Sequence, residues 1–360
     1  MGTCFSSACS GEEASPGKQE GDENTVYVGQ DDELSPDTKG RRIASLYSLQ
    51  GKKGLNQDAA ILCKGYGDED GLFCGVFDGH GRNGHFVSKF VRDYLPSLTL
   101  GERNSLQQAN EGSCEFTGSS DRSSTDGEGS PASSSEMLDE WNEACVHAFR
   151  ALDQELVLKL ELDCTYSGTT AVSIIKQGRD LVIANLGDSR AVMAAVSEDG
   201  RLEAIQLTTD LKPSVPEEAE RIRKSNGRVF ALKSEPHVQR VWLPDENYPG
   251  LAMARAFGDF HLKKYGVISV PEVSRYRLTH RDLFVVLASD GVWDVLTNEE
   301  VVAAVWSSSS QEESSRRLVE VARRRWKSKF PWAKVDDCTA ACLFFQERRD
   351  KAILLPQLPL

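Results

Sequence analysis

The chain of 360 residues lacks the features that define three common protein classes. No apolar run approaches the ~18 residues that a membrane-spanning helix needs, and the first residues lack the charged and apolar regions of a secretory signal. The nine cysteines include no C-x-x-C pair, and no histidines stand at zinc-finger spacing. We therefore expect a protein that stays out of the secretory pathway and keeps free thiols in a reducing compartment.

Positive charge is also scarce. The 42 lysines and arginines stand against 55 acidic residues, which gives a formal net charge of −13. Residues 11–37 hold nine of the acids and one lysine, so this segment is predicted to be a solvated, disordered arm. Because a nucleic-acid-binding protein is expected to carry a basic footprint, we expect no nucleic-acid partner.

Aspartates at the borders of apolar runs are the most informative feature present. The runs and their aspartates are 72–77 with Asp78, 283–288 with Asp290, and 338–345 with the preceding Asp336 and Asp337. The runs are predicted to be buried strands, and if they lie antiparallel in one sheet, the aspartates meet at one edge. Each aspartate alone is typical of a turn. Together they indicate a site for Mg²⁺ or Mn²⁺, which prefer oxygen ligands.

These aspartates come from near both ends of the chain, so the folded part is predicted to be one domain over residues 40–347. The arm at 1–39 precedes it and a tail at 348–360 follows it. Residues 101–135 are rich in Ser, Gly, Asp and Glu, and are predicted to be a flexible insertion. We expect a helix over 86–95 before this insertion and a second helix that begins near Met137.

Eight short motifs extend the pattern over most of the chain. They are KGLNQDA (53–59), DGHG (78–81), SGTTA (167–171), NLGDSRA (185–191), TDLKP (209–213), GLAMARAFGD (250–259), SDGVWD (289–294) and DDCT (336–339). In these motifs and their order the chain resembles the plant-type protein serine/threonine phosphatases of the protein phosphatase 2C (PP2C, PPM) family. The resemblance implies an α+β fold of two packed antiparallel β-sheets flanked by helices, a four-layer αββα sandwich. It also implies phosphoserine and phosphothreonine hydrolysis on protein substrates, kinases among them.

The resemblance further implies a centre of two Mg²⁺ or Mn²⁺ ions. Asp78 would bridge both ions, the Gly79 carbonyl would complete one, and Asp290 and Asp337 would complete the other. Asp58 would act through metal-bound water. A hydroxide that bridges the ions would then attack the phosphoryl group directly, without a phosphoenzyme.

Two side chains near this centre are candidate catalytic residues. His80 titrates near neutrality, so we expect it to protonate the serine or threonine leaving group; the alternative is a structural histidine in a turn. Lys53 is assigned to the substrate phosphate, and the alternative is a solvated surface lysine. Gln57 stands where many relatives outside the plant type carry Glu, so the water network near one ion should differ.

Asp188 lies in a turn between the apolar runs 181–186 and 191–196, a pattern typical of a hairpin. It is either structural there or the ligand of a weaker third cation. Residues 216–249 correspond to the family's variable flap. The flap residues His237, Arg240 and Trp242 either contact a phosphopeptide or pack the flap, and packing is favoured.

Two other motifs suggest different functions. Residues 79–84 read G-x-G-x-x-G, but Asp78 would face a dinucleotide pyrophosphate without a cation, and no βαβ series follows. Residues 280–283 resemble a kinase catalytic loop, but position 287 is Leu where that loop needs Asn. The competing class is a catalytically idle, membrane-tethered scaffold that binds phosphoproteins.

The first six residues match the M-G-x-x-x-[ST] pattern for N-myristoylation at Gly2, with Cys4 available for palmitoylation. One acyl chain binds membranes only marginally, so stable anchoring needs both. We therefore expect a monomer anchored at the cytoplasmic face of the plasma membrane, with the cytosol or nucleus as the alternative location.

A basic helix is predicted over 316–334. It carries eight lysines and arginines and an apolar face of Leu318, Val319, Val321 and Ala322. A solvated helix face is the favoured interpretation, and a patch for nuclear import or an acidic partner is the alternative.

Overall fold

The computed structural model describes residues 24–28, 44–114, 131–158 and 163–346. The predicted acylation sites Gly2 and Cys4, most of the acidic arm and the tail at 348–360 lie outside these ranges. Within them, no helix combines the length and apolar character that crossing a bilayer requires.

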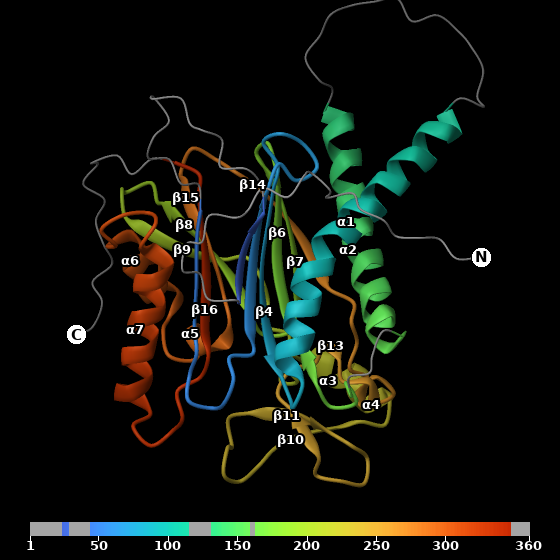
Figure 1. The fold of residues 1–360 in the computed structure, drawn as a ribbon, viewed down its shortest axis with the longest axis vertical. Coiled ribbons are helices and arrows are strands. Elements are labelled where there is room, and N and C mark those ends of the chain that lie inside the picture. The colour runs from blue at the N-terminus through green and yellow to red at the C-terminus, as the bar shows by residue number, and fades with distance from the viewer. Residues whose placement is uncertain (1–23, 29–43, 115–130, 159–162, 347–360) are drawn as a thin grey trace, which may run out of the picture.

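Two sheets stand side by side at the centre of the molecule (Figure 1). The first has the order β1-β3-β4-β6-β7-β14, and β5 pairs with β4 and β13 beside this path. Its strands are β1 (Thr25–Val28), β3 (Asp58–Lys64), β4 (Leu72–His80), β5 (Gly168–Thr169), β6 (Ala171–Gln177), β7 (Asp180–Leu186), β13 (Phe257–Gly258) and β14 (Glu272–Arg277). All of these pairings are antiparallel except that of β1 with β3.

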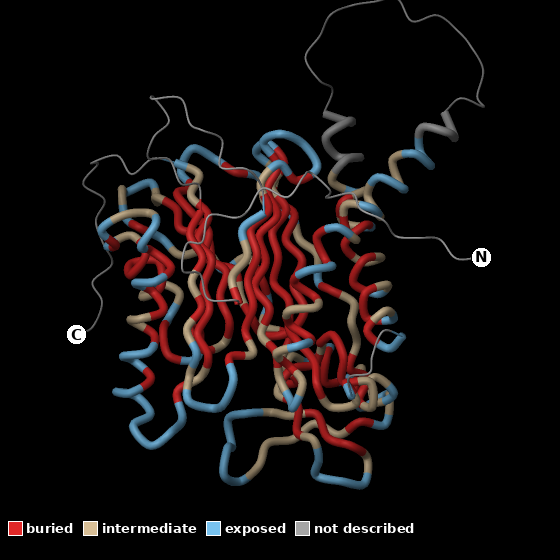
Figure 2. Tube along the Cα trace, in the orientation of Figure 1, coloured by how far each residue is buried: buried red, intermediate tan, exposed pale blue. Residues whose placement is uncertain are grey.

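The second sheet has the order β2-β16-β15-β8-β9 and is antiparallel throughout. Its strands are β2 (Ala44–Leu49), β8 (Arg190–Val196), β9 (Leu202–Gln206), β15 (Asp282–Ala288) and β16 (Cys338–Phe344). Every residue of β15 is buried, because this strand has the other sheet on one side and helices on the other. Figure 2 shows the central strands buried along most of their length.

Helices cover the outer face of each sheet. α1 (Gly84–Cys114) and α2 (Pro131–Leu158) cover the first sheet, and α5 (Asp290–Trp293), α6 (Asn298–Trp306) and α7 (Ser314–Lys329) cover the second. A capping box of Thr297 and Glu300 starts α6.

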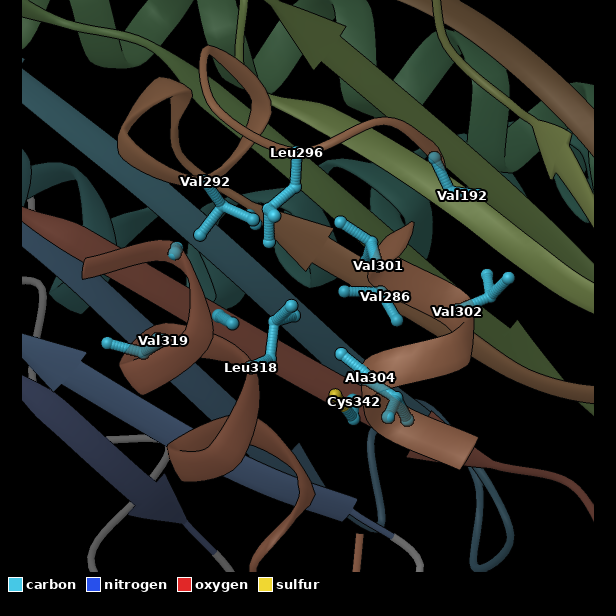
Figure 3. Close-up of a cluster of buried hydrophobic side chains, with 14 of the residues drawn as sticks. Val192, Val286, Val292, Leu296, Val301, Val302, Ala304, Leu318, Val319 and Cys342 are labelled. Atoms are coloured by element: carbon cyan, nitrogen blue, oxygen red, sulfur yellow. The ribbon is translucent and has the colours of Figure 1, made fainter. Parts of the chain in front are cut away.

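Three buried clusters separate the four layers. One lies under α1 and α2, one between the sheets, and one under the helices α5 to α7. In the last, Leu318 and Val319 of α7 pack over the sheet residues Val286 and Cys342 (Figure 3). The predicted αββα sandwich is confirmed.

A small third sheet lies at one end of the sandwich (Figure 1). It consists of β10 (Arg228–Ala231), β11 (Gln239–Trp242) and β12 (Pro249–Leu251), with α3 (Pro216–Lys224) packed on it and α4 (Phe260–Lys263) nearby. Trp242 is buried and donates from Nε1 to the Phe230 carbonyl over 3.0 Å. Arg240 donates to the Gly250 carbonyl over 3.0 Å. Both residues pack the flap as expected.

The predicted flexible insertion at 101–135 is wrong at both of its ends. α1 continues to Cys114 and α2 already begins at Pro131, so only 115–130 lie outside the described residues. The Arg103 guanidinium stacks 5.0 Å from the Trp141 ring of α2, and Asn110 donates to Glu140 over 3.1 Å. The polar part of α1 has too few apolar residues to form a stable helix by itself, and contacts with α2 therefore stabilise its helical conformation.

The predicted hairpin around Asp188 is also wrong. β7 belongs to the first sheet and β8 to the second, so the turn carries the chain from one sheet to the other. Both strands are buried almost throughout. Their sequences therefore lack the alternation of apolar and polar residues that would indicate a hairpin with one solvent-exposed face. The expectation that the three aspartate-bearing strands share one sheet fails as well, because β4 lies in the first sheet.

Candidate metal centre and active site

The strand pair β3 and β4 supplies the first half of the site. Asp58 stands directly opposite Asp78 in this antiparallel pair. Contrary to the sequence interpretation, β4 does not stop at Asp78 but continues to His80. Alternate residues of a strand point to the same side, so Asp78 and His80 share a face.

Gly79 allows the chain segments around Gln57 and Gly84 to pack closely against β4. A Cβ at Gly79 would lie 2.4 Å from the Gly84 carbonyl oxygen and 2.6 Å from that of Gln57, which is closer than real contacts allow. The Gly79 amide donates to the same Gln57 carbonyl over 3.1 Å. A larger residue would force the two chain segments apart.

The second sheet supplies the other half. Asp290 begins α5 immediately after β15, and Asp336 and Asp337 precede β16. Because β15 and β16 are antiparallel and pair Ala288 with Ala340, the end of one strand meets the beginning of the other. The carboxylates therefore converge across the two sheets of the sandwich, rather than along the edge of one.

Burial and mutual repulsion dominate the electrostatics of this cluster. Burial and the carboxylates of Asp290 and Asp58 hold the pKa of Asp78 well above its usual range. Burial and the carboxylate of Asp188 do the same for Asp290. Burial also raises the pKa of Asp58 to about 7, with Asp337 adding to the rise.

A hydrogen-bonded network fixes the Asp58 carboxylate. The Ser289 hydroxyl donates to Asp58 Oδ2 over 2.7 Å, and the same hydroxyl accepts from the Thr339 amide over 3.1 Å. The Thr339 hydroxyl lies 2.7 Å from that of Ser48. These polar side chains come from four different segments, so the network ties the two sheets together under the site.

The two adjacent aspartates differ in their surroundings. Both oxygens of Asp337 accept backbone N–H groups, from Gly51 over 2.7 Å and from Gln57 over 2.9 Å. Asp336 is the one whose negative charge raises the pKa of both Asp78 and Asp290. Successive residues of an extended segment point in opposite directions, and the sequence could not show which one faces the cluster.

Lys53 lies at the edge of the cluster. Its ammonium pairs with Asp336, and the side chain is half exposed. Burial lowers the pKa of Lys53, but the carboxylates of Asp336, Asp290 and Asp78 outweigh this and raise it overall. The predicted phosphate-binding cation is therefore beside the carboxylates and still open to solvent.

Asp188 approaches the cluster from the turn between the sheets. It is buried, and burial raises its pKa to about 6. The Lys212 ammonium lies 3.8 Å from Asp188 Oδ2, while Oδ1 is buried without a hydrogen-bond partner among the described residues. Asp294 was not singled out in the sequence, although it ends the motif SDGVWD, and its charge also raises the pKa of Asp290.

His80 has a partner that sequence reasoning missed. Its Nε2 lies 2.6 Å from Oδ2 of the buried Asp259, while Nδ1 has no partner among the described residues. Burial lowers the pKa of His80, but the Asp259 carboxylate more than offsets this, so the net shift is upward. Gly168 leaves room for the pair, since a Cβ there would lie 2.5 Å from Asp259 Oδ2. The only signal in the sequence was that Asp259 ends the motif GLAMARAFGD.

The donor set suits a hard divalent cation. The described part of the chain has no three His, Cys, Asp or Glu side chains already gathered as a metal cage. It does have mutually repelling carboxylates, and no described donor forms a hydrogen bond to the side chain of Asp78 or Asp290. Lys53 and Lys212 offset only part of the negative charge, since the pKa values of Asp188 and Asp290 remain raised, and Asp188 Oδ1 has no hydrogen-bond partner among the described residues. A bound cation would relieve the remaining repulsion.

Comparison with known proteins places this geometry in a family. The family model described as Protein phosphatase 2C matches residues 45–328. The probable protein phosphatase 2C 12 of Oryza sativa subsp. japonica is 54% identical, over 96% of this chain and 92% of that protein. The probable protein phosphatase 2C 72 of Arabidopsis thaliana is 50% identical, over 97% of this chain and 99% of that protein.

The crystal structure of a serine-threonine phosphatase 2C from Toxoplasma gondii superposes with a TM-score of 0.72. It is 27% identical and covers 84% of this chain and 94% of its own. The family model, the relatives and the fold agree, and the chain belongs to the protein phosphatase 2C family.

Proposed function

We propose that this protein is a metal-dependent phosphatase that hydrolyses phosphoserine and phosphothreonine on protein substrates, protein kinases among them. The observation that carries the proposal is the convergence of Asp78, Asp290 and Asp336 from two sheets, where Lys53 pairs with Asp336 but the pKa values of Asp78 and Asp290 stay well above their usual range. A catalytically idle scaffold would gain nothing from this repulsion, which costs stability in the absence of a ligand.

We assign two Mg²⁺ or Mn²⁺ ions to the site. Asp78 and the Gly79 carbonyl would hold one ion, and Asp290 and Asp336 would hold the other. Asp58 would orient water beside the two ions. Asp188 and the neighbouring Asp294 are the candidates for a weaker third ion. When bound, the cations would neutralise phosphoryl charge and increase the acidity of water.

The chain's own residues would then perform two tasks. Lys53 would attract the phosphate dianion through its exposed ammonium, which acts as a point charge. His80, held by Asp259 through Nε2, would present Nδ1–H to the departing serine or threonine oxygen. An alkoxide is a poor leaving group, so this proton transfer lowers the barrier to hydrolysis.

A phosphothreonine peptide assay tests the proposal. Activity should require Mg²⁺ or Mn²⁺ and should disappear in EDTA. Asp78→Asn should lower it at least ~100-fold, because even indirect partners of metal ligands cost 10- to 100-fold. Asp68→Asn is the matched control, since Asp68 is exposed in the loop at the other end of β4. Full activity of the folded Asp78→Asn variant, or in EDTA, would contradict the metal mechanism.

We also propose that Gly2 and Cys4 carry acyl chains that anchor the enzyme to the cytoplasmic face of the plasma membrane. The support is the sequence pattern alone, together with the need for two chains for stable binding. The enzyme would act there as a monomer.

A further inference from the structure

The end of α7 and the loop after it form an exposed aromatic surface. Residues 330–334 are all exposed, with Trp332 at 97% and Phe330 at 39%. A large apolar ring left in water costs free energy, and such residues are enriched where proteins contact partners. Within the part of the chain that the structure describes, Trp332 does not help to pack the fold.

The basic residues of α7 and of the loop after it are only partly paired with carboxylates. Arg324 and Arg325 form ion pairs with Glu320 and Glu300, so their charges are largely compensated within the protein. Lys327 and Lys334 have no carboxylate within ion-pair distance in the part of the chain that the structure describes. Arg317 and Arg323 also have no carboxylate within ion-pair distance among the described residues, but they lie earlier in α7, whereas Lys327 and Lys334 stand on either side of the exposed rings in the sequence.

This surface adjoins the carboxylate centre. The Lys52 amide donates to the Val335 carbonyl over 2.8 Å, and this bond holds the loop between β2 and β3 against the loop that precedes β16. Leu55, in the first loop, is 66% exposed. Figure 1 shows the end of α7 at the same end of the sandwich as the end of β4.

Lys329 connects the surface with the centre itself. Its ammonium donates to the Asp294 carbonyl over 2.8 Å, and the Asp294 carboxylate raises the pKa of Asp290. Lys329, Asp294 and Trp293 also line one open cavity with Arg190. The end of α7 is thereby held against the segment that carries Asp290 and Asp294.

We propose that Lys327, Phe330, Trp332 and Lys334, together with Leu55, form a docking surface for an acidic segment that flanks the phosphorylated residue of a protein substrate. The unpaired lysines would attract its carboxylates, and the exposed rings would cover an apolar side chain within it. This docking role rests on the proposed phosphatase activity.

Kinetics on paired substrates test the docking surface. Two phosphothreonine peptides, one with acidic and one with neutral flanks, are compared with p-nitrophenyl phosphate, which is too small to reach the surface. Trp332→Ala and the double variant Lys327→Glu, Lys334→Glu should each lower kcat/KM about tenfold for the acidic peptide, as for a central interface residue. Hydrolysis of p-nitrophenyl phosphate should not change. Leu158→Ala and Arg150→Glu are matched controls, since both residues are exposed on α2, in the opposite outer layer.

A binding measurement separates failure of docking from failure of catalysis. Fluorescence anisotropy of a labelled, unphosphorylated acidic peptide should show binding to the wild-type chain that Trp332→Ala weakens. Binding without any phosphatase activity would reject the proposed function but keep the docking surface. Equal kcat/KM losses on all three substrates, or no change on any, would overturn the docking proposal. Vesicles containing phosphatidylserine that bind through Trp332, with no peptide binding, would overturn it in favour of a membrane contact.

Discussion

Asp58 and Asp78 face each other directly across the antiparallel pair of β3 and β4. Side chains in this position project from the same face of a sheet, with Cβ atoms about 5 Å apart. Each is a carboxylate, and the negative charge of Asp58 raises the pKa of Asp78. A fold that places two acids in register in this way is destabilised by their repulsion until a proton or a cation relieves it.

This repulsion predicts an unusual pH dependence of stability without cations. The folded-state pKa is about 7 for Asp58 and about 6 for Asp188, against an ordinary value of 3.8. The folded protein thus binds protons that the unfolded chain releases. The stabilisation that comes from protonating these two carboxyl groups is fully present below about pH 4 and is lost as the pH rises through 6 and 7. In EDTA, the Tm should fall over this interval, and Mg²⁺ should restore it at neutral pH.

Asp58→Asn serves as the control for this measurement, because it removes one titrating acid without changing the size of the side chain. The decrease in Tm between about pH 4 and pH 7 should be smaller in this variant than in the wild type. An identical decrease in both would show that Asp58 does not contribute.

The two adjacent aspartates should behave differently when each is replaced by asparagine. Asp336→Asn should abolish cation-dependent activity with little effect on Tm, because its carboxylate faces the cluster. Asp337→Asn should mainly destabilise the protein, because its carboxylate accepts two backbone N–H groups. We expect the unfolding free energy to fall by about 1 to 3 kcal/mol, which lowers Tm. Activity assays and thermal unfolding distinguish the two. The reverse pattern would restore Asp337 as the ligand.

His80 and Asp259 should affect the same chemical step. His80→Gln should slow hydrolysis of an alkyl phosphate by about 100-fold or more, but p-nitrophenyl phosphate much less, because nitrophenolate hardly needs a proton. Asp259→Asn removes the charged partner of the imidazole and should shift the ratio of the two rates in the same direction, less strongly. A positioning role unrelated to proton transfer would instead lower both rates equally.

Acylation predicts a distinct distribution between membrane and soluble fractions. Gly2→Ala should release the protein into the soluble fraction, and Cys4→Ser should leave a mixed distribution, because one acyl chain binds reversibly. Fractionation and incorporation of labelled myristate measure this. A wild-type protein that takes up no myristate would contradict the anchor.

The family, the strands and most candidate site residues were accessible from the sequence because they depend on local patterns. Apolar runs of strand length predicted β4, β15 and β16, and the motifs beside them identified Asp78, Asp290 and His80. A few consecutive residues are enough to indicate both that a strand is buried and which side chain follows its end.

Only the tertiary structure decided how these pieces meet. The residues of β7 and β8 are buried on both faces, so their sequences do not show that the turn between them changes sheets. The polar part of α1 is helical because α2 packs beside it, 30 residues away in the chain at the Asn110 to Glu140 contact. Asp337 accepts two backbone N–H groups while Asp336 adds its charge to Asp78, and Asp259 reaches His80 across 179 residues, because long-range packing sets the direction of each side chain. Spacing along the chain determines which groups are available, and three-dimensional packing determines which of them touch.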